Sequence, residues 1–272
     1  MDFTVPEIAG GIIDAHVHAK QVDPWRSDDP VADLATDATR VGISTMITSV
    51  LGLGSYLATP TADDLVVANG WASEIVAGNA GFAGLVYCSP DHVDVSLELM
   101  RRHIAEGPFV GIKLWIARKA SDPALDPIVS YAAELGVPVL QHAWYKTVGQ
   151  LPGESTPADV AHLAARHPDA TIQMAHLSGC GERGVLDIAD LPNVVVDTCG
   201  GDPEDGMVDF ALEHLGAERI LYGSDAPGRD FGVQLSRVLA AGLDDDQLRA
   251  VLAGNARRLY TRLPAVDPTR EQ

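Results

Sequence analysis

Two histidines separated by one residue, in Asp14-Ala15-His16-Val17-His18, have the type and spacing expected of metal ligands. Side chains alternate between the two faces of a β-strand, so an extended segment places His16 and His18 together with Asp14. The other face then carries Ile13, Ala15 and Val17. Neutral imidazole is a good ligand for zinc and similar divalent ions. The pair therefore predicts two neighbouring metal ligands, with a hydrogen-bonded core histidine as the alternative.

Lys113 stands in an apolar segment, Phe-Val-Gly-Ile-Lys-Leu-Trp, that has the pattern of a buried strand. Alternation predicts that Lys113 points into the fold. The outward face is then expected to consist of Val110, Ile112 and Leu114. A buried lysine is costly unless it is paired, deprotonated or modified. Lys113 is therefore expected to be carbamylated and bridge two metal ions, to contact substrate as an amine, or to pair with a carboxylate such as Asp14 or Asp225.

Three more residues of metal-ligand type end apolar segments further along the chain. His142 ends Val-Pro-Val-Leu-Gln-His, His176 ends Ala-Thr-Ile-Gln-Met-Ala-His, and Asp225 ends Arg-Ile-Leu-Tyr-Gly-Ser-Asp. A single histidine at a strand end is more often structural than a ligand. The recurrence at one end of several segments, with Lys113 on a further one, instead indicates one shared metal site.

Short apolar or β-branched segments alternate with longer amphipathic stretches, which is the pattern of strands alternating with helices. We expect eight strands, at Gly11–His16, Ser44–Val50, Gly81–Cys88, Phe109–Trp115, Val137–His142, Thr171–His176, Asn193–Thr198 and Arg219–Asp225. Crossover helices are expected at positions that include Val31–Val41, Thr61–Ala77, Val93–Glu106 and Pro157–His167. Gly42 and Gly136 are expected to end helices, and Pro157 after Thr156 to begin one.

This alternation fits either an open doubly wound sheet or a closed (β/α)8 barrel. An open sheet that binds dinucleotides has a glycine-rich phosphate turn after an early strand, and no such turn follows Ile-Ile-Asp-Ala-His-Val-His. Polar residues instead gather at the C-terminal ends of the strands, where a (β/α)8 barrel has its active site. We therefore predict an α/β fold, a single (β/α)8 TIM barrel over residues 1–272, with a polar tail after about residue 263.

The composition restricts the classes of partner. A net charge of −19 disfavours nucleic acids and anionic membranes, which attract positive surfaces. No apolar run approaches the roughly 18 residues of a membrane span, and the N-terminus lacks the basic segment of a secretory signal, so we expect a cytoplasmic protein.

Cys88, Cys180 and Cys199 lie far apart, which argues against a disulfide framework and a thiolate zinc site. The expected partner is a small-molecule substrate, and formation of a homo-oligomer is left open.

The set of polar residues resembles the ligand set of the amidohydrolase superfamily. Its members place a His-x-His on strand 1, a residue such as lysine on strand 4, histidines on strands 5 and 6, and an aspartate on strand 8. The segments GIIDAHVH, VGIKLW, GVPVLQHA, AHLSG, ILYGSDAP and GNARRLY are similar, in the same order, to the amidohydrolase-related (amidohydrolase 2) branch of metal-dependent hydrolases and decarboxylases. One departure is that Trp115 and Ile116 follow Leu114, where that branch frequently has His-Pro. The resemblance therefore implies the superfamily and leaves the substrate open.

We expect His16, His18 and Asp225 to hold one divalent metal ion. His142 and His176 either complete this site or hold a second ion, which the carbamylated lysine then bridges. Zinc is the expected ion because imidazole and carboxylate are the ligands, with manganese as the alternative.

The expected activity is hydrolysis of an amide, lactone or other ester by a metal-activated water. Asp225 is the expected general base, and His176 is expected to be a second catalytic residue. Trp115, Arg118 and Trp144 lie on loops that would surround the pocket, and we expect them to contact substrate. Arg118 is a candidate for binding a substrate carboxylate, unless it faces solvent. The alternatives are non-oxidative decarboxylation of an aromatic or unsaturated acid, and a non-catalytic barrel that binds a small molecule.

Overall fold

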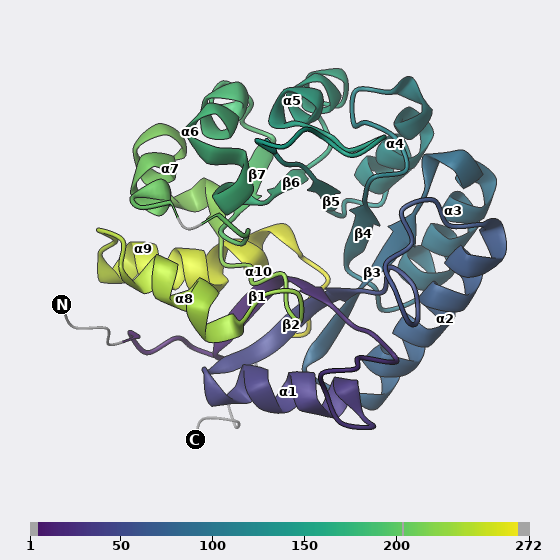
Figure 1. Ribbon diagram of the computed structural model, residues 1–272, viewed down its shortest axis with the longest axis horizontal. Coiled ribbons are helices and arrows are strands. Elements are labelled where there is room, and N and C mark those ends of the chain that lie inside the picture. Colours follow the sequence, from purple (N-terminus) through teal and green to yellow (C-terminus); the bar gives the residue numbers. More distant parts are fainter. Residues whose placement is uncertain (1–4, 203, 266–272) are drawn as a thin grey trace.

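The structure is a computed structural model that describes residues 5–202 and 204–265. Parallel strands form one sheet in chain order, and helices surround it (Figure 1). The strands are β1 (Ile12–His18), β2 (Ile43–Ser49), β3 (Phe82–Cys88), β4 (Gly111–Leu114), β5 (Val139–His142), β6 (Ile172–Ala175), β7 (Val194–Asp197) and β8 (Ile220–Leu221). The predicted (β/α)8 barrel is confirmed.

Backbone hydrogen bonds between β1 and the segment after β8 close the sheet. The N–H of Asp225 donates to the carbonyl of His16 at 2.8 Å. The N–H of His18 donates to the carbonyl of Ala226 at 2.7 Å. Because β8 contains only two residues, these bonds hold Asp225 beside the two histidines of β1.

Each crossover contains a helix. One main helix follows each strand. These helices are α1 (Pro30–Arg40), α2 (Ala62–Gly78), α3 (Val93–Met100), α4 (Asp126–Glu134), α5 (Pro157–Arg166), α6 (Leu177–Ile188), α7 (Met207–Leu215) and α8 (Phe231–Leu239). The chain continues through α9 (Asp245–Arg249), a π-helical turn (Ala250–Gly254) and α10 (Asn255–Leu259). Another π-helical turn, Arg101–Ala105, extends α3. Within the described part of the chain, no helix is long and apolar enough to cross a membrane.

The helix start and stop signals act as the sequence predicts. Thr156 and Asp159 form a capping box at the start of α5, with Pro157 in its first turn. Gly42 and Gly136 follow α1 and α4 with φ angles of +80° and +65°, a region that favours glycine. The predicted tail after about residue 263 falls mainly outside the described residues.

Several strand boundaries differ from the prediction. β1 continues to His18, so both histidines of the His-x-His pair lie within the strand. The predicted last strand, Arg219–Asp225, pairs only over Ile220–Leu221. The chain turns after β8, and Asp225 has a φ of +61°, a conformation that no strand residue adopts. Asp225 is therefore displaced from the strand that the sequence pattern assigns to it.

The predicted alternation in β1 is wrong for two of its apolar residues. Ile13 and Ala15 pack in a cluster with residues of β2, β3, β5, β6, β7 and β8, so they point into the barrel, as His16 does. Val17 packs in the larger cluster between the strands and the helices. The register of β1 against β2 shifts between Asp14 and Val17, and such a bulge changes which face a side chain occupies. Val110, expected to point outward, also packs in the inner cluster, because β4 begins only at Gly111.

The last helix closes the N-terminal end of the barrel. Tyr260, which follows α10, packs in the inner cluster with Ala253 and Ala256. Its hydroxyl donates a hydrogen bond to Oε1 of Gln173 on β6 at 2.6 Å, and both side chains are buried. The C-terminal part of the described chain is thereby connected to the polar interior of the barrel.

We expect Tyr260→Phe to lower the free energy of unfolding by about 1–2 kcal/mol, because it leaves a buried acceptor without its donor. The measurement is the thermal unfolding midpoint. Tyr131→Phe is the matched control, because this half-buried hydroxyl on α4 has no hydrogen-bond partner among the described residues. A Tyr260→Phe midpoint equal to that of the wild type would show that the bond does not stabilise the barrel.

Candidate metal centre

Three potential ligand atoms meet at the C-terminal ends of β1 and β8. Nε2 of His16 lies 3.1 Å from Nε2 of His18. Oδ1 of Asp225 lies 3.4 Å from Nε2 of His18 and 3.8 Å from Nε2 of His16. Nitrogen and oxygen ligands of one zinc ion are roughly 3–3.5 Å apart in tetrahedral or octahedral geometry. The three atoms therefore have nearly the spacing that one divalent ion requires.

The outer nitrogens of these two histidines have hydrogen-bond partners. Nδ1 of His16 lies 3.0 Å from Oδ2 of Asp197, and a carboxylate only accepts, so His16 carries its proton on Nδ1. Nδ1 of His18 lies 2.8 Å from Oγ of Ser49, a hydroxyl that can accept. With both protons on Nδ1, two Nε2 lone pairs and the carboxylate of Asp225 face one point, an arrangement that a cation satisfies. These residues therefore fit a divalent metal.

A second pair of nitrogens lies across the barrel, at the ends of β5 and β6. Nδ1 of His142 lies 3.1 Å from Nε2 of His176. Nε2 of His142 donates to the carboxylate of Glu154 at 2.9 Å, so its Nδ1 carries a lone pair. Glu154 is buried and also contacts Nζ of Lys146 at 2.7 Å. This pair can complete the first site or contribute to a second one.

Lys113 lies between the two pairs. Its side chain is buried, and Nζ is 3.0 Å from Nε2 of His16. Burial lowers the pKa of Lys113 to about 8, and the negative charges of Asp225 and Asp197 act in the opposite direction. The amine contacts the same lone pair of His16 that a metal ion would use. An ammonium at this position therefore competes with the ion, whereas a neutral or carbamylated Lys113 does not.

The titration behaviour of the ligands suits metal binding. Burial lowers the pKa of each imidazole, which favours the neutral, metal-binding form of His16, His18, His142 and His176. For Asp225, burial acts to raise the pKa, but the contact with His18 and the other neighbouring imidazoles outweigh it and hold the pKa well below its usual range. The centre therefore combines neutral nitrogens with an anionic oxygen.

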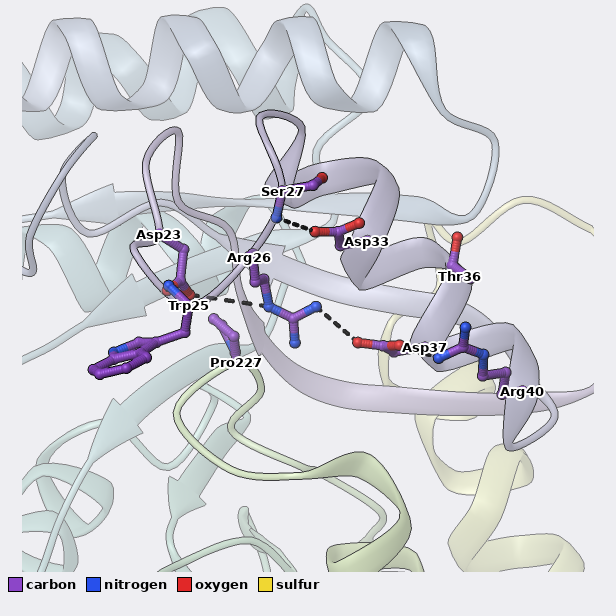
Figure 2. Close-up of a pocket in the computed structure, with 9 residues that line it drawn as sticks. All are labelled: Asp23, Trp25, Arg26, Ser27, Asp33, Thr36, Asp37, Arg40 and Pro227. Atoms are coloured by element: carbon purple, nitrogen blue, oxygen red, sulfur yellow. Dashed lines mark hydrogen bonds and ion pairs between the residues drawn. The ribbon is translucent and has the colours of Figure 1, made fainter.

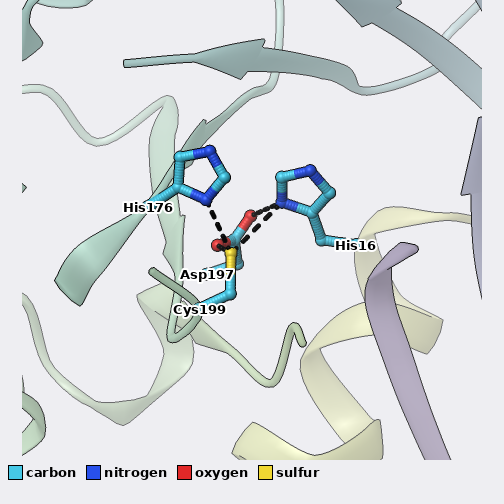
Figure 3. A group of neighbouring side chains, drawn as sticks. All are labelled: His16, His176, Asp197 and Cys199. Atoms are coloured by element: carbon cyan, nitrogen blue, oxygen red, sulfur yellow. Dashed lines mark hydrogen bonds and ion pairs between the residues drawn. The ribbon is translucent and has the colours of Figure 1, made fainter. Parts of the chain in front are cut away.

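A further group of ligand-type side chains lies behind the imidazoles (Figure 3). Sγ of Cys199 is 2.9 Å from Nδ1 of His176, 3.4 Å from Nδ1 of His16 and 2.8 Å from Oδ1 of Asp197. A sulfur and a nitrogen bound to one tetrahedral zinc ion would be about 3.5 Å apart. The shortest contacts of the thiol are therefore better explained by hydrogen bonds than by a metal ion bound between these groups.

Sequence analysis did not identify Glu154, Asp197 or Cys199 as functional residues. Asp197 is the last residue of β7, after Val-Val-Val, so the strand-end signal that identified His142 could also have identified it. Cys199 follows two residues later. Glu154 lies in an irregular loop, where no periodic pattern distinguishes it from the other loop carboxylates.

Aromatic rings lie beside the histidines. The ring of Trp144 is 5.0 Å from that of His176, measured between centroids. On the opposite side, the ring of Tyr56 is 5.3 Å from that of His18. Trp115 packs edge-on against Tyr56, with 5.8 Å between the ring centroids, so it is connected to the centre through that tyrosine.

Arg118, the third residue expected to contact substrate, turns toward the surface. Its guanidinium forms ion pairs with Asp91 at 2.5 Å and Asp122 at 3.3 Å, and its side chain is 45% exposed. Arg118 is thus already neutralised by two carboxylates.

A surface hollow of about 610 Å³ lies next to the loop after β8 but is separate from the ligands (Figure 2). It is lined by Asp23, Trp25, Arg26, Ser27, Asp33, Thr36, Asp37, Arg40 and Pro227. Its charged groups pair with one another, as Arg26 does with Asp37 at 2.7 Å. None of the candidate metal ligands lines this hollow.

Comparisons with known proteins agree with this architecture. A family model described as amidohydrolase matches residues 13–262, whereas a search of curated sequences gave no match. The 2,6-dihydroxybenzoate decarboxylase from Rhizobium is similar in structure, with a TM-score of 0.74 and 18% identity over 92% of this chain and 98% of that chain.

Two further solved structures resemble this one. A dihydroxybenzoic acid decarboxylase from Polaromonas, solved with bound manganese and 2-nitroresorcinol, has a TM-score of 0.71 and 16% identity over 94% of this chain and 98% of that chain. A Pseudomonas putida protein, to which 2-pyrone-4,6-dicarboxylic acid hydrolase activity is ascribed, has a TM-score of 0.63 and 19% identity over 94% of this chain and 99% of that chain. At such identities the similarity shows the fold.

Glu154 generates a prediction about pH. Burial raises its pKa, but hydrogen bonds from His142, Lys146 and the backbone N–H of Leu151 outweigh that effect and lower the pKa to about 2. A carboxylate whose pKa is depressed by folding stabilises the protein above its unfolded pKa, and this stabilisation is lost as the pH falls through the folded value. Between about pH 5 and about pH 3, the thermal midpoint of the wild type should therefore fall more steeply than that of Glu154→Gln.

Glu98→Gln is the control for this experiment. Its carboxylate also pairs with a cation, Arg101, but both side chains are exposed, so solvent screens the interaction. We expect its acid dependence to match that of the wild type. If Glu154→Gln does so as well, Glu154 does not contribute the stability assigned to it.

Proposed function

Because the chain belongs to the amidohydrolase family, we propose that it is a metal-dependent hydrolase that cleaves an amide, lactone or other ester. The observation that carries this proposal is the convergence of His16, His18 and Asp225, whose ligand atoms lie 3.1–3.8 Å apart. Two imidazole lone pairs and a carboxylate facing one buried point are costly without a cation. Family membership and ligand geometry thus both support metal-dependent catalysis.

In this proposal His16, His18 and Asp225 hold the first ion, and His142 and His176 complete its coordination or hold a second ion. Lys113, as a carbamate, would supply oxygen ligands if two ions bind. When bound, the metal lowers the pKa of a coordinated water and polarises the carbonyl of the substrate. Zinc is proposed from the ligand types, and manganese is the alternative because it is bound in the Polaromonas decarboxylase.

The protein side chains then orient the substrate and move its protons. Asp225, whose side chain is 16% exposed, accepts a proton from the attacking water and delivers it to the leaving group. His176, 3% exposed, is the second proposed catalytic residue, and its Nε2 can exchange a proton only when it does not hold an ion. Trp144 beside His176 provides a flat apolar surface for the substrate. We propose a smaller role for Trp115, because Tyr56 lies between it and His18.

Arg118 remains a candidate for binding a substrate carboxylate, but it must first release Asp91 and Asp122. In the conformation described, its charge is directed away from the metal centre.

The second candidate function is non-oxidative decarboxylation of an aromatic or unsaturated acid. The aromatic rings on both sides of the histidines favour it, because Trp144 and Tyr56 can hold a planar substrate between them. In this reaction the bond between the ring carbon and the carboxylate breaks and CO₂ leaves. The electron pair of that bond remains on the ring carbon, which takes a proton that Asp225 has first accepted from a water molecule, and the hydroxide left behind combines with the CO₂ as bicarbonate.

We expect the purified protein to contain about one to two equivalents of a divalent metal, because its ligands can satisfy either number. Elemental analysis gives the stoichiometry. A panel of amides, lactones and hydroxybenzoic acids, assayed for acid release and for CO₂, then separates hydrolysis from decarboxylation. Full activity in a chelator, with no metal retained after growth in zinc or manganese, contradicts both functions.

We expect Asp225→Asn to lower turnover by about two orders of magnitude or more, since it removes the general base. The fold should persist because the change is isosteric. Asp37→Asn, in the surface hollow, is the matched control and should retain turnover. Metal content, measured alongside, shows whether lost activity reflects a lost ligand or a lost base. Near-native turnover of Asp225→Asn on an identified substrate would exclude the proposed role.

A further inference from the structure

Two cations lie in loops at the C-terminal end of the barrel, where the candidate metal ligands also lie. Lys20 is in the loop after β1. Arg229 is in the loop after β8, and its backbone N–H donates to the carbonyl of Asp225 at 3.2 Å. Within residues 5–202 and 204–265, neither side chain forms an ion pair with a carboxylate. The chain has a net charge of −19, so the lack of a carboxylate partner leaves both positive charges free for a ligand.

Tyr56, in the loop after β2, connects these cations with the metal centre. Nζ of Lys20 is 4.5 Å from the centroid of the Tyr56 ring, and that centroid is 5.3 Å from the ring centroid of His18. Burial raises the pKa of Tyr56, and the positive charge of Arg229 acts in the opposite direction. The charge of Arg229 therefore also reaches the Tyr56 hydroxyl, and three separate loops contribute to one side of the metal centre.

Two donors of this group are buried without an acceptor among the residues that the structure describes. They are the hydroxyl of Tyr56 and Nε of Arg229. Another nitrogen of the same guanidinium, Nη1, donates to the carbonyl of Gly228 at 2.9 Å. A buried donor without an acceptor is costly, and native proteins contain few of them. The two donors therefore favour a ligand that accepts hydrogen bonds.

Gly201, in the loop after β7, makes room for the guanidinium of Arg229. A Cβ atom at position 201 would lie 2.9 Å from Nη2 and 3.4 Å from both Cζ and Nε. The guanidinium thus packs against the backbone of the β7 loop, while its charge acts on Tyr56 in the β2 loop. These loops flank the ends of β8 and β1, so Arg229 lies on the side of the centre that Asp225 and the β1 histidines form.

The two carboxylates that raise the pKa of Tyr56 have other partners. Asp225 is a proposed metal ligand, so a bound ion neutralises its charge. Asp23 accepts a hydrogen bond from the backbone N–H of Trp25 at 3.1 Å, and it lies 4.0 Å from Nε of Arg26 (Figure 2). Neither carboxylate is therefore available to neutralise the two cations.

We propose that Lys20, Tyr56 and Arg229 form a carboxylate-binding subsite beside the metal centre. The substrate then carries a carboxylate in addition to the group that reacts at the metal, so this inference rests on the proposed function and narrows its substrate class to anions. A guanidinium matches the two oxygens of a carboxylate, and the ammonium and the phenol supply further donors. Arg118, by contrast, is already paired with two carboxylates.

The test is equilibrium binding to the zinc-loaded protein, measured by isothermal titration calorimetry. The probes are benzoate and the ortho, meta and para benzenedicarboxylates. Benzoate offers one carboxylate, which the metal can bind, and the diacids offer a second carboxylate at increasing distances. We expect at least one diacid to bind about tenfold or more tightly than benzoate, the effect of one hydrogen-bonded charge.

The variants remove one group of the subsite at a time. Arg229→Gln and Lys20→Met should each weaken binding of the best diacid about tenfold or more, with a smaller effect on benzoate. Tyr56→Phe, which removes only the hydroxyl, should weaken it about fivefold. Arg40→Gln is the matched control, because it removes an exposed guanidinium that pairs with Asp37, and it should bind both probes as the wild type does. Circular dichroism verifies that each variant is folded.

The inference is overturned if the wild type does not prefer any diacid to benzoate, or if the preference persists in both Arg229→Gln and Lys20→Met. It is also overturned if Arg118→Gln alone abolishes the preference, because the carboxylate then binds at Arg118. A protein that prefers a diacid but hydrolyses no substrate retains the subsite and loses the proposed function. Hydrolysis of neutral amides or lactones with no preference for a carboxylate has the reverse meaning.

Discussion

The candidate metal centre depends on where the buried imidazoles carry their protons. In each ring the proton must lie on the nitrogen that faces away from the metal position, so that the other nitrogen offers a lone pair. His16 uses Asp197, His18 uses Ser49, and His142 uses Glu154 for this purpose. An imidazole buried without such a partner loses its solvation and can rotate or change tautomer. The partners come from β7, β2 and the loop after β5, so most of the barrel must be in place before the inner nitrogens converge.

Barrel closure sets the position of the anionic ligand. Asp225 lies beyond the end of β8, and its N–H bonds to the carbonyl of His16, so the carboxylate is held by β1 as much as by its own strand. Its left-handed backbone conformation turns the side chain toward His18. A residue in this sparsely populated region requires support from its surroundings, and the paired backbone provides it.

The sequence predicted the fold and the inward residues of metal-ligand type because both depend on local patterns. His142 at the end of β5 and Lys113 on β4 occupy the expected places. Alternation failed at Ile13 and Ala15, because a bulge depends on the neighbouring strand and leaves no signal in the segment itself. The partner of His16 lies 181 residues away, a pairing that only the closed barrel defines.

The polar chain from His16 through Asp197 and Gln173 to Tyr260 has a consequence for biosynthesis. His16 leaves the ribosome before Gln173, Asp197 and Tyr260, because it precedes them in the chain. Contacts of such high sequence separation form slowly, and the early strands expose apolar edges while they wait. Nδ1 of His16 therefore lacks its carboxylate partner until β7 has been synthesised.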